Sequence, residues 1–248
     1  MSQWLLPPLA LAWVRLLLSL YAFVTIFVIF GWDDAHHNSI LVRQSFSYFT
    51  DLVYYGLAFY FLFSGLHTFL YARNGKSWLQ SWPRPLQAAH YLYFTTIITF
   101  PILVTAVFWA ILYNGHWSPV VFNGWSDISK HALNTVFAAF EIFMTRTSPP
   151  PTLHLWLLVI LLALYLALAY LTHATEGFYP YDFLDNSNGR SSTVAAYAFG
   201  ILAAIIIIFG VVWGTIWLRR WTTEKKLGLE GKFWSARRSA DGDVEMKG

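Results

Sequence analysis

The sequence predicts an all-α, polytopic membrane protein, a bundle of six transmembrane helices, and three observations lead to this fold class. Hydrophobic residues make up 57% of the 248 residues and charged residues only 12%, whereas soluble domains carry about a quarter charged residues. Aromatic residues reach 19%. Six apolar stretches each offer the roughly 20 residues that a spanning helix needs. They occupy residues 1–218 and leave no room for a separate soluble domain.

In chain order, the expected spans cover residues 9–30, 47–71, 89–113, 128–147, 153–175 and 193–218. The first is expected to be a retained span, because it lacks the basic leading segment and small-residue cleavage site of a signal peptide. The fourth is the most polar, with His131, Asn134 and Glu141 inside it. Three consecutive prolines at 149–151 end that span and force a tight connection to the fifth.

Basic residues are distributed unequally between the two sides of the predicted bundle. One side carries Arg73, Lys76, Arg84, Arg146 and the eight basic residues of the segment 219–248, and the other carries Arg43, Lys130 and Arg190. Cytoplasmic loops of membrane proteins are enriched in Lys and Arg, so both termini are predicted to be cytoplasmic. The segment 219–248 is predicted to be a disordered basic tail at the membrane surface.

Several classes of function are excluded by composition and motifs. The chain has no Cys, which excludes disulfides, thiolate nucleophiles and iron–sulfur clusters. It also lacks the hydrolase elbow, the zinc-protease motif, the phosphate loop and the dinucleotide fingerprint. The basic residues follow membrane topology and do not indicate nucleic-acid binding. We expect no metal and no cofactor, and the lipid bilayer is the expected environment of an integral membrane protein.

Three polar residues in different spans are predicted to lie near the same, outer membrane face. At a rise of about 1.5 Å per residue, Thr50, His131 and His173 each fall within roughly 10 Å of that face. Polar side chains are costly there and often mark a functional site. The structural alternatives are a Thr bonded to the carbonyl one turn back, a His that bonds between helices, and a His at a helix end.

Acidic and amide side chains accompany these three residues. Asn134 and Glu141 share a helical face with His131, and such a polar stripe is expected to face the bundle interior. Glu141 lies deeper and is expected to stabilise helix packing or hold a proton. Glu176 is one of several acids close to His173 that could orient its imidazole, together with Asp182 and Asp185.

Two pairs of histidines leave a second reading open. His67 and His90 lie toward the inner face, and His131 and His173 lie toward the outer face. Two histidines near each face, on different helices, is also how a six-span haem-b electron carrier would be built. A non-enzymatic membrane bundle is the third alternative.

Several motifs together resemble the androgen-induced gene and androgen-dependent TFPI-regulating protein family. In chain order they are Phe100-Pro101 ahead of Ala106-Val107-Phe108-Trp109, then Gly124-Trp125 ahead of His131, Glu141 and Arg146-Thr147-Ser148, and finally Tyr170 to Thr175 ahead of Tyr179 to Leu184. The matches run from about Tyr48 into the sixth span. The segment from Asp51 to Gly56 resembles a fungal branch of the family.

The resemblance implies an intramembrane hydrolase that cleaves fatty acid esters of hydroxy fatty acids with a Thr nucleophile and a His. The family's His falls on His131, and its Thr falls on Thr50, which follows Tyr48 and Phe49. If the family is aligned instead on the Asp-Leu-Val that follows Thr50, the register shifts by two residues. Tyr48 then falls at the position of the family's nucleophile. In this reading His131 is the general base. The expected substrate-binding or supporting residues of the site are His173, Asn134, Glu141 and Glu176.

Overall fold

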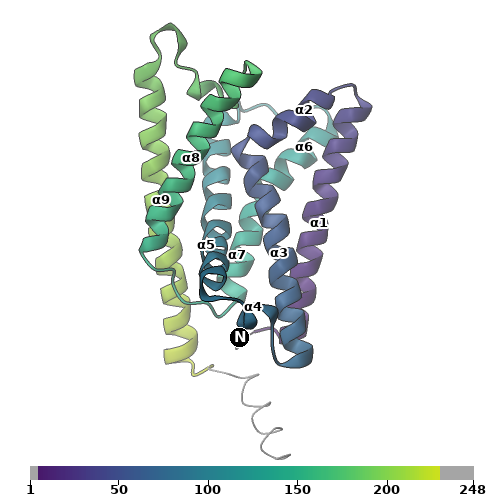
Figure 1. Cartoon of the computed structure of the whole chain (residues 1–248), viewed down its shortest axis with the longest axis vertical. Helices are drawn as coiled ribbons and strands as arrows, with labels where there is room; N and C mark the ends of the chain where they lie inside the picture. Colours follow the sequence, from purple (N-terminus) through teal and green to yellow (C-terminus); the bar gives the residue numbers. More distant parts are fainter. Residues whose placement is uncertain (1–4, 230–248) are drawn as a thin grey trace, which may run out of the picture.

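A computed structural model describes residues 5–229 of the protein, and every regular element in that range is helical. The long helices run side by side in one bundle, as Figure 1 shows. α1 begins and α9 ends at the end of the bundle where α4 (Trp78–Ser81) lies, and α2 (Ser39–Gln44) lies at the opposite end. We refer to these as the α4 end and the α2 end.

Five helices among the described residues are long and apolar enough to cross a membrane. They are α1 (Pro8–Ala35), α3 (Phe49–Asn74), α5 (Arg84–Val107) with the π-helical turn η2 (Phe108–Leu112), α8 (Leu153–Glu176), and α9 (Ser191–Arg220) with the π-helical turn η6 (Trp221–Lys226). Their positions correspond to five of the six expected spans. The all-helical, membrane-embedded architecture is therefore confirmed.

The region of the fourth expected span is a continuous helical run that is not among those five. It consists of α6 (Val121–Ile128), the π-helical turn η3 (Ser129–Leu133) and α7 (Asn134–Met144). Figure 1 places α7 between α3 and α5, within the bundle. The polar side chains of Ser129, Asn134 and Glu141 are buried, whereas the apolar Val136 and Phe143 on the same run are exposed. The run can therefore carry polar side chains on its inner face.

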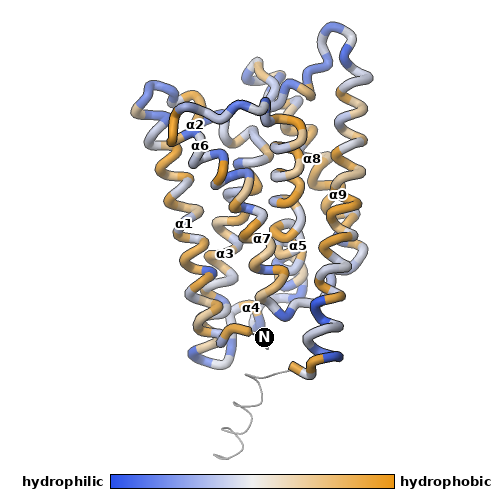
Figure 2. The backbone as a smooth tube through the Cα atoms, turned by 180° about the vertical axis from the view of Figure 1, so that it is seen from behind, coloured by the Kyte–Doolittle hydropathy of each residue, from blue (hydrophilic) through white to orange (hydrophobic). Residues whose placement is uncertain are grey.

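The interior of the bundle consists of two clusters of buried apolar side chains. One joins α1, α3, α5, α7 and α9 around Leu57, Phe61 and Ile98, and the other joins α3, α5, α8 and α9 around Leu103 and Leu158. Large apolar side chains also cover the outside of the long helices, including Phe27, Trp156, Phe199 and Ile207. Figure 2 shows hydrophobic residues along the length of these helices and hydrophilic ones mainly at both ends. Helices that are apolar all round are typical of membrane spans.

Short helices close the two ends of the bundle. At the α2 end, η1 (Ser45–Ser47) leads into α3, and η4 (Asp182–Leu184) and η5 (Ser187–Gly189) lie in the connection from α8 to α9. At the α4 end, α9 continues past the expected span end at residue 218 and, with η6, reaches Lys226, where Glu224 pairs with Arg146 at 2.9 Å. The rest of the expected tail, from residue 230, lies outside the described residues.

Candidate functional site

Thr50 lies in the first turn of α3, at the edge of an apolar cavity of about 260 Å³. The side chain is 8% exposed. The cavity lies among α3, α5, α8, α9 and the connection 177–190, and its lining is mainly aliphatic and aromatic, with Leu103, Val159 and Leu202 as examples. The polar side-chain atoms in this lining belong to Thr50, Tyr165 and Tyr181. The cavity therefore combines room for a hydrocarbon chain with three hydroxyl groups at one point.

The two tyrosines hold the start of α3. The first N–H groups of a helix have no partner within the helix; here Phe49 N–H donates to Tyr165 Oη at 3.2 Å and Thr50 N–H donates to Tyr181 Oη at 3.3 Å. The hydroxyl of Thr50 also contacts Tyr181 Oη, at 3.5 Å. Tyr181 was not predicted as a site residue from the sequence, although it lies in the Tyr179 to Leu184 motif.

His131 lies in the π-helical turn η3, and its ring has a defined environment. Nδ1 lies 3.1 Å from the backbone oxygen of Asp127. Because a carbonyl oxygen can only accept, Nδ1 carries the hydrogen and Nε2 is the unprotonated nitrogen of the neutral ring. The ring stacks on Phe108 with centroids 3.6 Å apart, and Trp109 Nε1 donates to the His131 carbonyl at 3.1 Å. The orientation of His131 leaves Nε2 available to accept a proton.

An ion pair links the neighbours of Thr50 and His131. Lys130 Nζ lies 3.0 Å from Asp51 Oδ1, and both side chains are largely buried. The pair joins η3 to the first turn of α3, so both candidate residues lie toward the α2 end. Within residues 5–229 there is no hydrogen bond between the Thr50 hydroxyl and His131. Catalytic hydrogen bonds are often long or absent before substrate binds.

His173 and Glu176 also lie toward the α2 end, in the last turns of α8, but in different environments. The His173 ring stacks on Tyr179 at 3.8 Å, and its buried Nδ1 has no hydrogen-bond partner among residues 5–229. Glu176 forms an exposed ion pair with Arg43 at 2.8 Å. α8 then ends at Gly177, whose φ of 77° lies in the left-handed region that favours glycine. Neither His173 nor Glu176 hydrogen-bonds to Thr50 in the described structure.

Asn134 and Glu141 are fully buried together with Ala138, as expected for a polar stripe that faces the interior. They belong to separate networks. Asn134 Oδ1 accepts from Thr105 Oγ1 at 3.0 Å and from the following backbone N–H at 2.6 Å, whereas its Nδ2 has no partner in the described part of the chain. Neither Asn134 nor Glu141 lines the Thr50 cavity.

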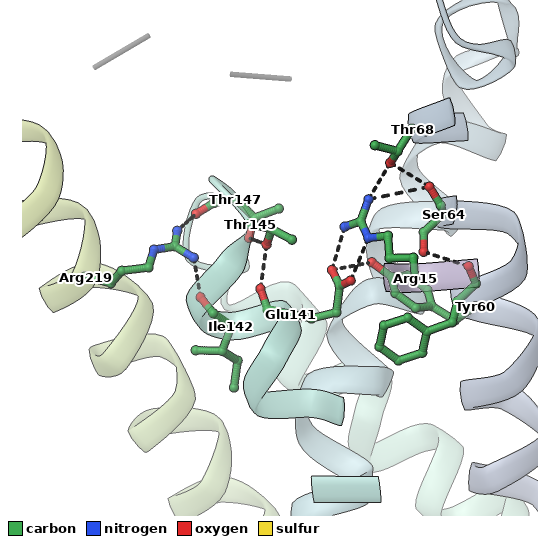
Figure 3. A network of polar contacts seen from close by, with 10 residues as sticks. Arg15, Tyr60, Ser64, Thr68, Glu141, Ile142, Thr145, Thr147 and Arg219 are labelled. Atoms are coloured by element: carbon green, nitrogen blue, oxygen red, sulfur yellow. Dashed lines mark hydrogen bonds and ion pairs between the residues drawn. The ribbon is translucent and has the colours of Figure 1, made fainter. Parts of the chain in front are cut away.

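Glu141 is paired with Arg15 of α1. The Arg15 guanidinium donates from Nε and Nη2 to the two carboxylate oxygens, each at 2.7 Å, and Tyr60 Oη donates at 3.3 Å. Arg15 Nη1 donates to Thr68 at 2.6 Å. Figure 3 shows this network beside Arg219 of α9, which donates to the carbonyls of Ile142 and Thr147. Arg15 was not predicted as a partner of Glu141, although a lone Arg within an apolar stretch is a signal that could have indicated one.

The histidine pairs of the haem alternative differ from each other. His67 and His90 lie close together, with ring centroids 5.5 Å apart. In the other proposed pair, His131 and His173 each stack on a different aromatic ring, Phe108 and Tyr179.

Comparison with known proteins identifies the family. The sequence model described as FAR-17a/AIG1-like protein matches residues 14–215, which include Thr50, His131, Glu141 and Tyr181. No curated protein and no solved structure matches the chain. The matched region covers most of the 248 residues, and it contains all the motifs on which the resemblance was based. The chain therefore belongs to the FAR-17a/AIG1-like family, the family of the androgen-induced gene proteins.

Proposed function

We propose that this protein is an intramembrane hydrolase that cleaves a lipid ester, with Thr50 as the nucleophile and His131 as the general base. The substrate class that family membership favours is fatty acid esters of hydroxy fatty acids. The observation that carries the proposal is the position of the Thr50 hydroxyl, which lies at an apolar cavity of about 260 Å³ inside a membrane-embedded bundle. An ester bond flanked by hydrocarbon matches a hydroxyl flanked by aliphatic side chains.

The proposed reaction has two steps. His131 Nε2 takes the proton of the Thr50 hydroxyl while Thr50 Oγ1 attacks the ester carbonyl, and the protonated His131 then gives that proton to the departing alkoxide oxygen, which leaves as the alcohol product. In the second step His131 takes a proton from water, whose oxygen attacks the acyl-threonine carbonyl. His131 then returns the proton to the departing Thr50 Oγ1, which releases the fatty acid and restores the hydroxyl. In this scheme the Asp51–Lys130 pair holds the two helical segments in register.

The proposed topology places this site near one membrane face. We take the run α6–η3–α7 as one more crossing, fourth in chain order, which brings the total to six. It lies among α3, α5 and the other long helices. The excess of Lys and Arg at the α4 end supports a cytoplasmic position for that end and for both termini. The site then lies toward the lumenal or extracellular face, in an integral membrane protein of the endoplasmic reticulum or plasma membrane.

Covalent labelling tests the proposal directly. Detergent-solubilised protein is treated with a fluorophosphonate probe, and wild type is compared with the variants Thr50→Ala and His131→Ala. We expect labelling of wild type at Thr50 and loss of labelling in both variants, because the hydroxyl needs a base to become nucleophilic. If both variants are labelled and hydrolyse the substrate at the level of wild type, the mechanism is ruled out. If folded wild type does not react, an absorption spectrum of the same sample tests for haem.

A further inference from the structure

We propose that Tyr181 is a further catalytic residue, whose phenol O–H donates a hydrogen bond to the oxyanion formed when Thr50 attacks the ester carbonyl. This inference rests on the proposed function and assigns a role to the side chain that contacts the candidate nucleophile. In the structure that contact is made by Tyr181, with Oη 3.5 Å from Thr50 Oγ1. No hydrogen bond reaches the Thr50 hydroxyl from His131 or His173 within the described residues.

The hydrogen bonds around the phenol indicate where its own hydrogen is available. Tyr181 Oη accepts the Thr50 N–H, so its O–H is not needed to hold that contact. The neighbouring Tyr165 differs, because its O–H donates to the Ser47 carbonyl at 3.1 Å while its oxygen accepts the Phe49 N–H. Of the two phenols that line the cavity, Tyr181 is therefore the one with a hydrogen available beside the nucleophile.

Position and environment suit an oxyanion donor. The oxyanion forms one bond away from the carbon that Thr50 Oγ1 attacks, so a donor that now lies 3.5 Å from Oγ1 can come within the required distance of about 2.7–3.1 Å. Burial raises the pKa of Tyr181, which keeps the phenol protonated. The start of α3 adds a favourable dipole, since the first N–H groups of the helix point toward the same place.

Aromatic contacts hold the phenol in place. The Tyr181 ring stacks on Phe183, with centroids 5.2 Å apart and planes 3° apart, and meets the Tyr48 ring edge to face at 5.7 Å. A donor fixed before the reaction needs no reorganisation in the transition state. During acylation the carbonyl π electrons move to oxygen as the bond to Thr50 Oγ1 forms. The charge returns to the carbonyl when the alcohol leaves, and Tyr181 remains neutral throughout.

Deletion of a single hydroxyl tests this role. Tyr181→Phe is compared with Tyr179→Phe, a matched deletion in the same connection whose hydroxyl donates to the exposed Asn186. For each variant we measure kcat, KM and the affinities for two inhibitors. The first is a long-chain trifluoromethyl ketone, to which Thr50 adds reversibly to form an oxyanion. The second is the corresponding alcohol, which cannot form one. We expect Tyr181→Phe to lower kcat and trifluoromethyl ketone affinity by about 10²-fold each, the scale for one oxyanion donor. The KM and the alcohol affinity of Tyr181→Phe should stay near the wild-type values. In Tyr179→Phe all four quantities should stay near wild type.

The outcomes separate this inference from the proposed function. If Thr50→Ala is inactive while Tyr181→Phe keeps kcat and ketone affinity within about twofold of wild type, the Tyr181 role is wrong and the hydrolase stands. Full activity of Thr50→Ala would overturn both. If Tyr181→Phe also loses alcohol affinity, its fold is impaired. Replacement of Tyr181 by 3-fluorotyrosine then tests whether the phenol donates to the oxyanion. That change keeps the shape and makes the phenol a stronger donor, so it should tighten ketone binding; unchanged or weaker ketone binding would contradict the role.

Discussion

The two ends of the bundle differ in how completely their buried polar groups are hydrogen-bonded. At the α4 end, each group in the arginine network has partners: Arg15 is bonded to both carboxylate oxygens of Glu141 and to Thr68, and Arg219 is bonded to two backbone carbonyls. At the α2 end, within residues 5–229, the Thr50 hydroxyl has one long contact and the buried Nδ1 of His173 has no partner. At the α4 end, His67 departs from this pattern, since neither ring nitrogen has a partner among the described residues.

This difference separates a structural network from a candidate reactive one. A buried charge pair with complete hydrogen bonding stabilises one arrangement of helices and resists change, since removal of either partner leaves an uncompensated charge. A hydroxyl and an imidazole with spare capacity can exchange protons and bind a substrate. Incomplete bonding at the α2 end is therefore as informative as complete bonding at the α4 end.

The largest expected contrast is between two threonines of the same helix. We expect Thr50→Ala to lower the turnover of a fatty acid ester of a hydroxy fatty acid by at least about 10³-fold, because it removes the nucleophile, with little change in unfolding temperature. Thr68→Ala should lower the unfolding temperature and leave kcat close to wild type, because the Thr68 hydroxyl accepts from Arg15 and donates to the Ser64 carbonyl and does not line the Thr50 cavity. Equal effects of both changes on turnover would remove the distinction between the two ends.

Disruption of the arginine network should affect stability. We expect Glu141→Leu to lower the free energy of unfolding by about 3–5 kcal/mol, because it leaves Arg15 buried without its counter-charge. The double change Arg15→Met with Glu141→Leu should recover most of that loss. Denaturant unfolding in detergent measures both. A double variant as unstable as the single one would show that the network contributes more than charge compensation.

The Asp51–Lys130 pair lies at the α2 end and should behave differently from the buried Arg15–Glu141 pair. It is largely buried but keeps some contact with solvent, whereas the Arg15–Glu141 pair is almost completely buried, so we expect Asp51→Asn to cost less stability than the roughly 3–5 kcal/mol expected for Glu141→Leu. Because the pair aligns the segments that carry Thr50 and His131, kcat should fall by about tenfold, within the range that misplacement can cause. Lys130→Gln and the double variant complete a cycle in kcat. Additive effects on kcat would mean that the pair has no role in alignment.

The smallest effect is expected at the exposed pair of Glu176 and Arg43. Glu176→Gln should change stability by no more than about 0.5 kcal/mol and turnover by no more than about twofold, because exposed ion pairs contribute little. Arg43→Gln is the matched control. A large loss of turnover in Glu176→Gln alone would restore Glu176 as a supporting site residue, as the sequence analysis expected.

Much of the fold could be predicted from hydropathy, and the candidate nucleophile and base from motif spacing. The five confirmed spans are apolar stretches whose length matches a bilayer. Family membership followed from the order of motifs around residues 100, 124 and 172. The roles of Thr50 and His131 remain predictions. The partners of these residues were not predictable, because a hydrogen bond between distant segments leaves no periodic trace in the sequence.

By itself, therefore, the sequence determined the helical membrane architecture, the family and the polar residues worth testing, because bilayer length and burial act locally along the chain. Tertiary structure alone decided which groups meet. It joined Arg15 to Glu141 across 126 positions and Thr50 to Tyr181 across 131 positions. It also formed an apolar cavity beside the Thr50 hydroxyl. Such pairings depend on helix packing in three dimensions, where side chains far apart in the chain compete for the same buried space.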